Sequence, residues 1–427
     1  SYGMMGDDNL GGLYPDFAYL SGYTYYKGQS LMPDDPFSSV KSKKVIGSAP
    51  KGIPVTTISW MKIKLMNVGI DFGFFDNRLT GEFDLFKRMR DGIPGTPSDI
   101  MFPLETGLSA LPENMNSDMT VGFDAFVKWN DKVGDLKYSV GANITFARQK
   151  NGKRHGEIFG NAWDKYRWAQ SNRWSNVVLN TDQGNAGGVW MWEVIGRFET
   201  QEQIDSYPVD QDGQNNATVR PGDVILRDVN GDGIINDFDE RPQAYASADW
   251  PWDSSTSNKN PLISMGINLG FEWKGFDVAA DFAGGFKNTF VADWDLKWGV
   301  TRSVNGYYYN NIDVWRHEDI FDPKSPWIPG KFPALRGQES HSGRWWNSFY
   351  TREVNYLRLR NLVVGYSLPK NWIRKVGMEQ CRIYFQGTNL FCLSSLHDYG
   401  FDPEISTVNG QDYPQHKVLT LGVNVKF

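Results

Sequence analysis

The sequence predicts an all-β chain that forms part of an antiparallel transmembrane β-barrel with long extracellular loops. Three observations predict this fold. Apolar and polar residues alternate with period two in stretches of about ten residues, the span of a tilted membrane strand. Short turns alternate with long polar connections along the chain. Aromatic residues stand at strand ends, where a belt at the lipid headgroups is expected. The pattern predicts about ten to eleven strands.

The composition fits a large β-rich chain. The 427 residues include 44 Gly, 17 Trp and 15% aromatic residues. No apolar stretch reaches the roughly 18 residues of a transmembrane helix. Lys and Arg total 44 against 50 Asp and Glu, which gives a net charge of -6 and argues against nucleic acid, because phosphate binding requires a basic surface. Cys381 and Cys392 lack the spacing of a metal site, and no disulfide is indicated. The chain starts at Ser1 without a signal peptide, so we expect it to be a fragment of a longer protein.

Three hairpins and a terminal strand carry the clearest alternation. The terminal strand places Leu419, Leu421, Val423, Val425 and Phe427 on one face. The hairpins are predicted at 68–85, 121–146 and 263–282, around turns at 75–78, 130–135 and 274–275. An antiparallel sheet with one face in a soluble core would alternate in the same way. The long segments at 91–116, 150–260 and 287–352 favour the membrane barrel, because compact soluble domains rarely contain structureless segments of that length.

The segment 353–368 predicts a further strand that contains an irregularity. Leu357 and Leu359 share one face, whereas Leu362 and Val364 have the opposite phase. One extra residue near Arg360 would restore the register, so we predict a β-bulge there. A short helical turn opening at a proline is predicted over 369–375, before a strand at 382–390.

Four ordered motifs resemble one known family. They are the hairpin 67–81, the acidic segment 228–239, the strand 356–369 with the sequence YLRLRNLVVGYSLP, and the segment 382–391, followed in the same order by the terminal Phe427. Together they resemble the SusC/RagA family of TonB-dependent transporters over about residues 60–427.

The resemblance implies a barrel of about 22 strands that encloses an N-terminal plug domain. It implies active import across the bacterial outer membrane, driven through TonB, with a SusD-like surface lipoprotein as a lid and oligosaccharides or peptides as cargo. Residues 1–427 would then be the C-terminal half of the barrel, in contact with outer-membrane lipid. The plug and the early strands are not found in this sequence, and 150–260 would be a long extracellular loop.

The segment 228–239 also predicts a calcium site. Its oxygen-bearing residues fall in register with the ligand positions of an EF-hand-type loop, and Gly233 allows the tight bend. The predicted ligands are Asp228, Asn230, Asp232, Asn236, Asp239 and the backbone carbonyl of Ile234. The last position is Asp rather than Glu, as in dockerin-type loops. The alternative is an Asx-rich turn that needs no ion.

Aromatic residues in the long loops are candidates for cargo binding. Flat rings beside polar donors suit sugars, whose C–H faces are apolar. The candidates are Trp163, Trp168, Trp190, Trp298, Tyr308 and Trp345. The alternative is that these rings pack loops together or contact a partner protein.

The polar residues of the strands predict the path of the cargo. Cargo would pass inward-facing residues, namely Asp124, Lys128, Asn143, Asn268 and Asp281. None of the five histidines lies in a nucleophile, zinc or triad signature, so we do not expect an enzyme. A rival hypothesis is a secreted, calcium-clipped, β-rich glycan-binding module, which would be soluble without detergent. A passive porin is disfavoured by the family resemblance.

Overall fold

The computed structural model describes residues 1–7, 23–27, 46–50, 59–95, 113–151, 162–163, 166, 189–244, 261–291, 313–334, 347–397, 402–404 and 415–427. The chain divides into two compact units. The first unit contains Ser1–Met66, Lys87–Thr120 and Asn151–Gly160. The second contains Asn67–Phe86, Val121–Lys150 and Asn161–Phe427.

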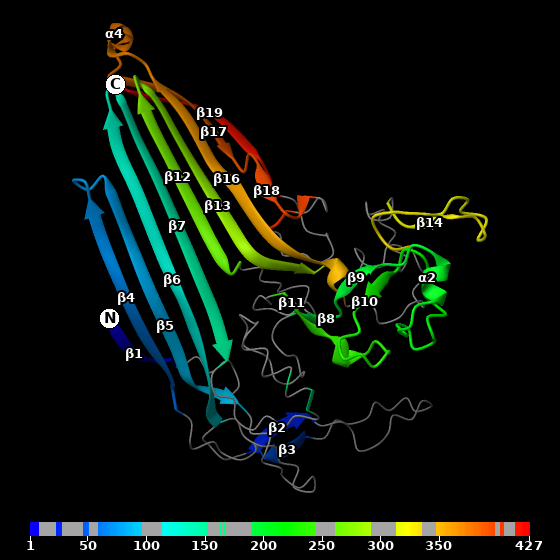
Figure 1. The fold of residues 1–427 in the computed structure, drawn as a ribbon. Coiled ribbons are helices and arrows are strands. Elements are labelled where there is room, and N and C mark those ends of the chain that lie inside the picture. Colours follow the sequence, from blue (N-terminus) through cyan, green and yellow to red (C-terminus); the bar gives the residue numbers. More distant parts are fainter. Residues whose placement is uncertain are drawn as a thin grey trace, which may run out of the picture. The chain divides into compact units, whose positions relative to one another are not determined.

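Most strands belong to one antiparallel sheet (Figure 1). Its main path runs through β1 (Tyr2–Asp7), β4 (Met61–Phe74), β5 (Leu79–Gly95), β6 (Glu113–Val133), β7 (Leu136–Asn151), β12 (Ile263–Trp273), β13 (Phe276–Val291), β16 (Thr351–Ser367), β17 (Gln380–Thr388) and β19 (Val418–Lys426). A short strand, β18 (Cys392–Ser394), pairs with β16 and brings the sheet to eleven strands. Strands follow one another in the order of the sequence, which is the up-and-down connectivity of a barrel wall. The predicted all-β, antiparallel fold is confirmed.

The predicted hairpin turns are short because their residues accept a left-handed backbone. Lys274 and Gly275 join β12 to β13 with φ of 46° and 89°, as a type I′ turn requires. Phe75, Asp76 and Asn77 have φ between 56° and 62° in the turn after β4. The connections β7–β12 and β13–β16, at the opposite strand ends, are long, so short and long connections alternate as predicted.

The predicted bulge lies in β16. Asp281 of β13 is paired with Asn361, and the next residue, Phe282, is paired with Leu359, so Arg360 is the extra residue. The bulge places Leu359 opposite Phe282 and Leu362 opposite Ala280. Because paired residues share a face, the apolar residues on both sides of the bulge lie on one side of the sheet.

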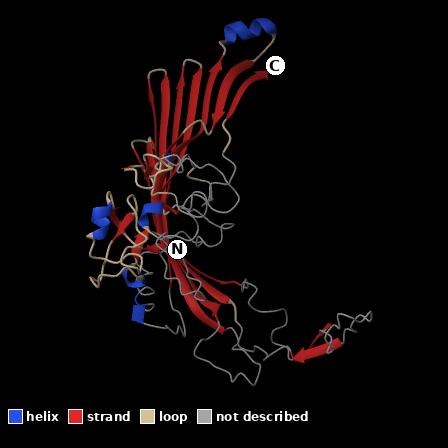
Figure 2. Ribbon diagram, turned by 90° about the vertical axis from the view of Figure 1, so that its right-hand side faces the viewer, coloured by secondary structure: helices blue, strands red, loops and turns tan. Residues whose placement is uncertain are grey.

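The predicted helical turn follows β16. Pro369 stands at the N-cap of α4 (Lys370–Ile373), and η6 (Arg374–Val376) continues the turn. It ends at Gly377, whose φ is 77°. Figure 2 shows that helices contribute only such short segments, whereas strands dominate the described chain.

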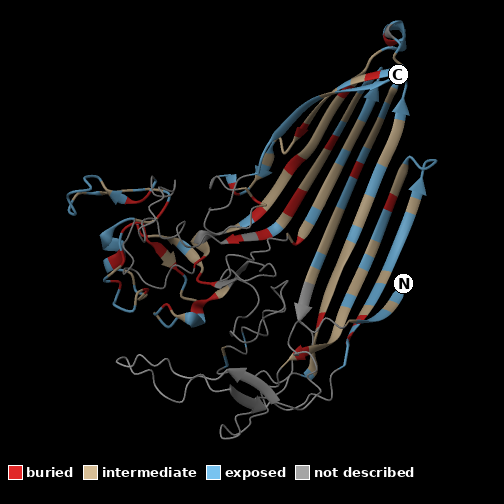
Figure 3. Ribbon diagram, turned by 180° about the vertical axis from the view of Figure 1, so that it is seen from behind, coloured by how far each residue is buried: buried red, intermediate tan, exposed pale blue. Residues whose placement is uncertain are grey.

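The strands of the second unit have one apolar face that remains exposed. Ile70, Val423 and Leu421 are 64%, 57% and 78% exposed. Other exposed apolar residues in these strands are Val68, Phe83, Val127, Val140, Phe271, Phe276 and Ile383. Figure 3 shows exposed residues recurring along the strands rather than only at their ends. A soluble sandwich would bury such rows beneath a second sheet, so their exposure fits the predicted contact with lipid. Among the described residues, no helix has the length and apolar character needed to cross a membrane.

The first unit contains strand pairing and an ion pair of its own. β1 pairs with the first half of β4, from Tyr2 opposite Met66 to Asp7 opposite Met61. Arg90 forms an ion pair with the buried carboxylate of Asp118. This unit also contains the hairpin β2 (Tyr23–Lys27) and β3 (Ile46–Pro50).

Residues 189–244 and 313–334 form a set of short elements, which we call the loop module. Its elements are β8 (Val189–Met191), β9 (Val194–Arg197), α2 (Gln201–Asp205), β10 (Val224–Leu226), η3 (Asp237–Asp239), β11 (Arg241–Ala244), β14 (Arg316–His317) and β15 (Trp327–Ile328). Trp192, Leu226 and Ile235 belong to one buried cluster. A second cluster joins Val314 and Phe332 to residues of β13 and β16. η5 (Ser348–Tyr350) leads into β16.

A charge on the apolar face should destabilise the protein in a bilayer. Leu421→Arg, in the middle of β19, is expected to lower the free energy of unfolding by about 2–4 kcal/mol if this row faces lipid near the midplane. Thr420→Arg, one residue away on the opposite face, is the matched control and should have a much smaller effect. Urea unfolding of the full-length protein in lipid vesicles measures both. Equal effects at the two positions would contradict the assignment of the faces.

Candidate functional site

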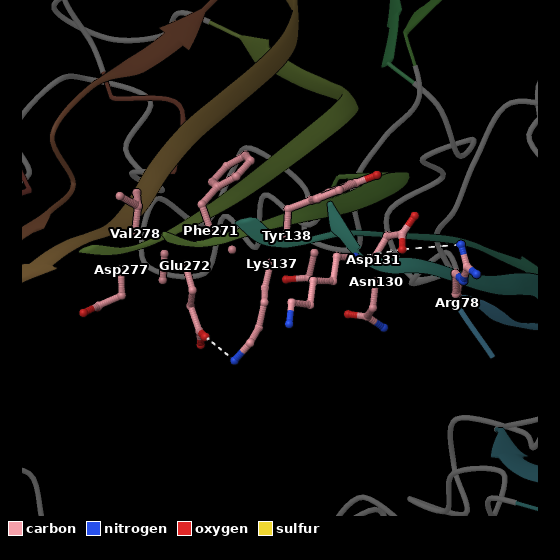
Figure 4. A pocket seen from close by; sticks show the side chains of 13 residues that line it. Arg78, Asn130, Asp131, Lys137, Tyr138, Phe271, Glu272, Asp277 and Val278 are labelled. Atoms are coloured by element: carbon pink, nitrogen blue, oxygen red, sulfur yellow. Dashed lines mark hydrogen bonds and ion pairs between the residues drawn. The ribbon is translucent and has the colours of Figure 1, made fainter. Parts of the chain in front are cut away.

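An open hollow lies near the short turns of the second unit. It has a volume of about 620 Å³ and is lined by residues of β6, β7, β12 and β13 and by Arg78 of the turn between β4 and β5. Lys137 of β7 forms an ion pair with Glu272 of β12 at 3.0 Å, and Arg78 reaches Asp131 at 3.5 Å. In Figure 4 the side chains of Lys137 and Glu272 extend to one side of the strands, and the ring of Phe271 extends to the other.

Cross-strand pairs give this face its polar character. Glu272 is directly opposite both Lys137 and Asp277 in the sheet. Further along the strands, Asn268 donates a hydrogen bond to Asp281 at 2.7 Å. Asn268 and Asp281 were predicted to line one inner surface, and the structure brings them together. Of the other predicted inward residues, Lys128 and Asn143 lie beside Gly141 and Gly266, and Asp124 alternates with the apolar row of β6.

An arginine reaches across a whole strand because a glycine leaves room for it. Arg382 of β17 forms an ion pair with Asp277 of β13, passing over β16 at Gly365. A Cβ atom at Gly365 would lie 2.4 Å from the guanidinium of Arg382. This bridge between next-nearest strands was missed from the sequence. The alternation showed which face Gly365 occupies but not which side chain lies above it.

A second arginine cluster lies on the same face of β16. The guanidinium of Arg358 is 4% exposed and contacts Asp402 at 2.5 Å and Glu404 at 3.0 Å. Arg360, the bulged residue, also pairs with Glu404. Gln415 donates to the same carboxylate at 3.0 Å. A buried guanidinium is costly unless it is paired, so this cluster fastens residues 402–404 to the strand.

The predicted calcium ligands lie in one turn that is organised by its own hydrogen bonds. The Asp228 carboxylate accepts from the backbone N–H groups of Gly231 at 2.6 Å and Gly233 at 2.8 Å. Asp232 accepts from the Ile234 N–H and from the Asn230 amide, both at 2.9 Å.

Asp239, the last acidic residue of the turn, is hydrogen-bonded to the backbone of residues earlier in the turn. Asp239 is fully buried and accepts from the N–H groups of Val229 and Asn236, each at 2.9 Å. The Asn236 amide group lies 3.3 Å from the Asp232 carboxylate. Within the described ranges, no group of three His, Cys, Asp or Glu side chains is arranged to hold a metal ion. A cation here would depend on the Asn oxygens and the Ile234 carbonyl as well as on the carboxylates.

Local hydrogen bonds in this turn favour the ionised form of Asp232. Hydrogen bonds from the Ile234 N–H and the Asn230 side chain lower the pKa of Asp232. Asp210, in a neighbouring acidic turn, pairs its backbone with this loop: its N–H donates to Gly233, and its carbonyl accepts from Ile235, both at 2.9 Å. This neighbour was not predicted from the sequence.

The neighbouring turn is closed by Asp212. Its carboxylate accepts from the N–H groups of Gln214, Asn216 and Thr218 at 2.7–2.9 Å and from the Thr218 hydroxyl at 2.7 Å. Partial burial alone would raise the pKa of Asp212, but these hydrogen bonds to the charged form lower it to about 2. The ionised side chain therefore stabilises the turn.

The structure describes two of the six aromatic candidates. Trp163 stacks on Tyr166 at 5.3 Å between ring centroids and meets Phe238 edge-on at 5.4 Å. The Arg241 guanidinium lies 5.4 Å from the Trp163 ring centre. These contacts favour the packing alternative for Trp163. Trp190 lies in β8, where its backbone pairs with Pro242. Four candidates lie outside the described residues: Trp168, Trp298, Tyr308 and Trp345.

Removal of the Asp212 carboxylate should open the turn 210–218. Asp212→Ala leaves several N–H groups without their acceptor, at a cost of about 1–3 kcal/mol. In the wild type, the folded pKa lies below the unfolded value of about 3.9, so this stabilisation is complete above pH 4 and is lost as pH falls toward 2. Hydrogen exchange of residues 210–218 at pH 7 and pH 3 measures both effects. The control is Asp205→Ala in α2, and equal exchange in the two variants would contradict the prediction.

Comparison with known proteins shows what this chain is similar to. No protein-family model matches the chain. The chain is 22% identical over 438 residues to the TonB-dependent receptor SusC of Bacteroides thetaiotaomicron, and the match covers 100% of this chain and 37% of that receptor. It is also 22% identical over 418 residues to the TonB-dependent receptor P3 of Formosa agariphila, covering 92% of this chain and 36% of the relative. The chain thus spans somewhat over a third of the length of these receptors.

Solved structures show the same fold. The RagAB peptide importer in its open-open state matches 100% of this chain and 39% of its own chain, with a TM-score of 0.62 and 19% identity. Its closed-closed state gives a TM-score of 0.61 at 19% identity and covers 100% of this chain and 40% of that chain. Together with the four ordered motifs, sequence matches, two of which extend over the whole of this chain, confirm the predicted resemblance to the SusC/RagA family of TonB-dependent receptors.

Proposed function

We propose that the chain forms part of the wall of an outer-membrane, TonB-dependent importer of oligosaccharides or peptides. The observation that carries this proposal is a layer of antiparallel strands with an exposed apolar face and a paired, polar face. In hydrocarbon, backbone N–H and C=O groups must be satisfied within the protein, and a β-sheet can do this only when its strands pair side by side into a closed barrel. The relatives are receptors rather than enzymes, which is in line with a non-enzymatic role.

The polar face would serve as the surface that cargo passes. Oligosaccharides and peptides carry many hydrogen-bonding groups, so their transfer through a barrel requires a wet, polar wall. Pairs such as Lys137–Glu272 and Asn268–Asp281 supply donors and acceptors without a large net charge. A face of balanced charge suits neutral or zwitterionic cargo better than it suits strongly anionic cargo.

Two partners belong to the proposal for the whole protein. TonB would supply energy through a plug domain, and a SusD-like lipoprotein would cover the outer opening. Support comes from the relatives, which are TonB-dependent receptors, and from the similarity in fold to the RagAB peptide importer. Trp168, Trp190, Trp298, Tyr308 and Trp345 remain predicted cargo contacts.

A second proposal concerns the turn 228–239, which we infer to be a structural calcium clip. The support is the register of its oxygen ligands, the lowered pKa of Asp232 and the hydrogen bonds that already gather Asp228, Asn230, Asp232 and Asn236 into one turn. Bound calcium would neutralise the mutual repulsion of these carboxylates. The position in the loop module favours a role in stability rather than in cargo binding.

The import hypothesis predicts a nutritional phenotype. Deletion of the full-length protein should abolish growth on one class of oligosaccharide or peptide as sole nutrient, and complementation should restore growth only in cells that contain TonB. Uptake of labelled oligosaccharides and peptides of matched mass identifies the class. Uptake without TonB would favour a passive porin. A protein that is soluble and monodisperse without detergent would favour the secreted glycan-binding module.

The calcium hypothesis predicts a protease-sensitive turn. Chelation of divalent ions should speed cleavage within 228–239 by about tenfold or more, and calcium should restore protection. Asp232→Asn keeps the oxygen that accepts from Ile234 but removes a charge, so it should raise the calcium concentration needed for protection. The control is Asp237→Asn, which lies in the same turn outside the ligand set. Equal protection with and without calcium would exclude the ion.

A further inference from the structure

The short helical segment formed by α4 and η6 is fixed to one end of the sheet. Its first helix contacts β17, and the side chain of Ile373 is buried. The carbonyl of Ile373 accepts from the N–H of Met378 at 3.2 Å, and the next N–H, that of Glu379, donates to the carbonyl of Lys426 at 2.7 Å. The segment therefore has a defined place at the end of the strands that carries the short turn between β12 and β13 (Figure 1).

The helix α4 lies against the apolar face of β17. Cys381 belongs to this face, because it is paired with Val425 and precedes Ile383 by two residues. Val425 and Ile383 are 43% and 42% exposed, whereas Cys381 is only 6% exposed. The contact between α4 and β17, together with the burial of both Cys381 and Ile373, indicates that the helix covers this end of the row. The segment is thus continuous with the exposed apolar face.

The exposed side of the segment carries charge of one sign. Lys370, Arg374 and Lys375 are exposed, and the segment contains no Asp or Glu. The first acidic residue after it, Glu379, is paired with a lysine of β19 at 3.2 Å. Within the described part of the chain, none of the three cations forms an ion pair. Lys370 and Arg374 are four residues apart on a helix, where like charges repel, so an anion bound between them would stabilise the segment.

Aromatic rings accompany these cations at the same end of the sheet. Trp372 of the segment is 65% exposed. Trp273 and Phe276, at the ends of β12 and β13, are half exposed, and the Phe276 ring lies 4.4 Å from that of Tyr366. Lys274 Nζ lies 5.4 Å from the centre of the Trp273 ring. Amphipathic rings beside cations are the composition of a membrane–water interface.

We propose that α4 and η6 bind the headgroup of an anionic phospholipid in the periplasmic leaflet, and this inference rests on the proposed function. The short turns of outer-membrane barrels face the periplasm, so this end of the sheet lies at that leaflet. The phosphate would lie among Lys370, Arg374 and Lys375, because clustered cations beside an apolar surface attract anionic lipids. An acidic protein would match the charge alone, whereas a phospholipid matches both the cations and the adjoining apolar face.

The test measures lipid binding to the purified full-length transporter in a neutral detergent. Native mass spectrometry follows the binding of short-chain phosphatidylglycerol and of phosphatidylethanolamine, whose headgroup has no net charge. The triple variant Lys370→Gln, Arg374→Gln, Lys375→Gln should raise Kd for phosphatidylglycerol by about tenfold or more, because each cation contributes to attraction of an anionic headgroup. Its Kd for phosphatidylethanolamine should change little. The three side chains are exposed, so the variant should fold.

A matched control removes the same charge elsewhere. Arg316→Gln, Lys324→Gln, Lys417→Gln replaces three exposed cations outside the segment and should leave the affinity for phosphatidylglycerol unchanged. A photo-crosslinking amino acid in place of Trp372 identifies the neighbour of the segment in living cells. This second readout does not depend on the affinity of any charge variant.

The outcomes separate the inference from the proposed function. Weaker phosphatidylglycerol binding by the triple variant alone, with a crosslink from position 372 to phospholipid, supports the inference. Equal binding by the wild type and the triple variant overturns it while the proposed function stands. An equal loss in the control variant, or a crosslink from position 372 to a periplasmic protein in place of lipid, also overturns it. A full-length protein that is soluble and monodisperse without detergent overturns the proposed function and the inference together.

Discussion

The hydrogen-bonded pairing of neighbouring strands is the constraint on which the rest of this structure depends. The backbone N–H and C=O groups of a strand in hydrocarbon cannot stay unpaired. Such a strand must therefore pair with its neighbours along the whole length that lies in the hydrocarbon. Once pairing fixes the backbone, the pleat sends successive side chains to opposite faces. The register from Trp273 to Ile263 against β7 and β13 is unbroken. The apolar and polar faces of β7, β12 and β13 follow from that register.

The polar face shows how such a sheet accommodates charge. At the exposed end near the short turns, pairs such as Lys137–Glu272 contribute little to stability, because water competes for both partners. Deeper on β16, Arg358 is nearly inaccessible and requires the carboxylates of Asp402 and Glu404. Exposed pairs such as Lys137–Glu272 make the surface polar, whereas the buried contacts of Arg358 hold residues 402–404 against β16. The Arg382–Asp277 bridge combines both roles, since it crosses β16 on the surface that cargo would pass.

Much of the fold was predictable because it depends on local periodicity. The alternation in 263–282 specified both strands and their turn, and the loss of phase near Arg360 specified a bulge. The arginine clusters were not predictable in this way. Asp402 is far from Arg358 in sequence, and alternation does not reveal which residues meet across Gly365. The acidic turn 228–239 was recognised from its spacing, whereas its pairing with Asp210 depends on tertiary structure. Trp163 illustrates another limit, because the sequence gives no indication that its ring packs against Phe238 and Arg241.

The bulge at Arg360 has a consequence for how this strand can change. It joins two halves of β16 whose alternation is out of phase by one residue. Deleting Arg360, or inserting one residue beside it, would turn one half of the strand over while the other half kept its orientation. Leu357 and Leu359 would then lie on the polar face, and Arg358 would lie on the apolar face without Asp402 or Glu404. A change of one residue in the length of this strand would therefore exchange the two faces over half of it.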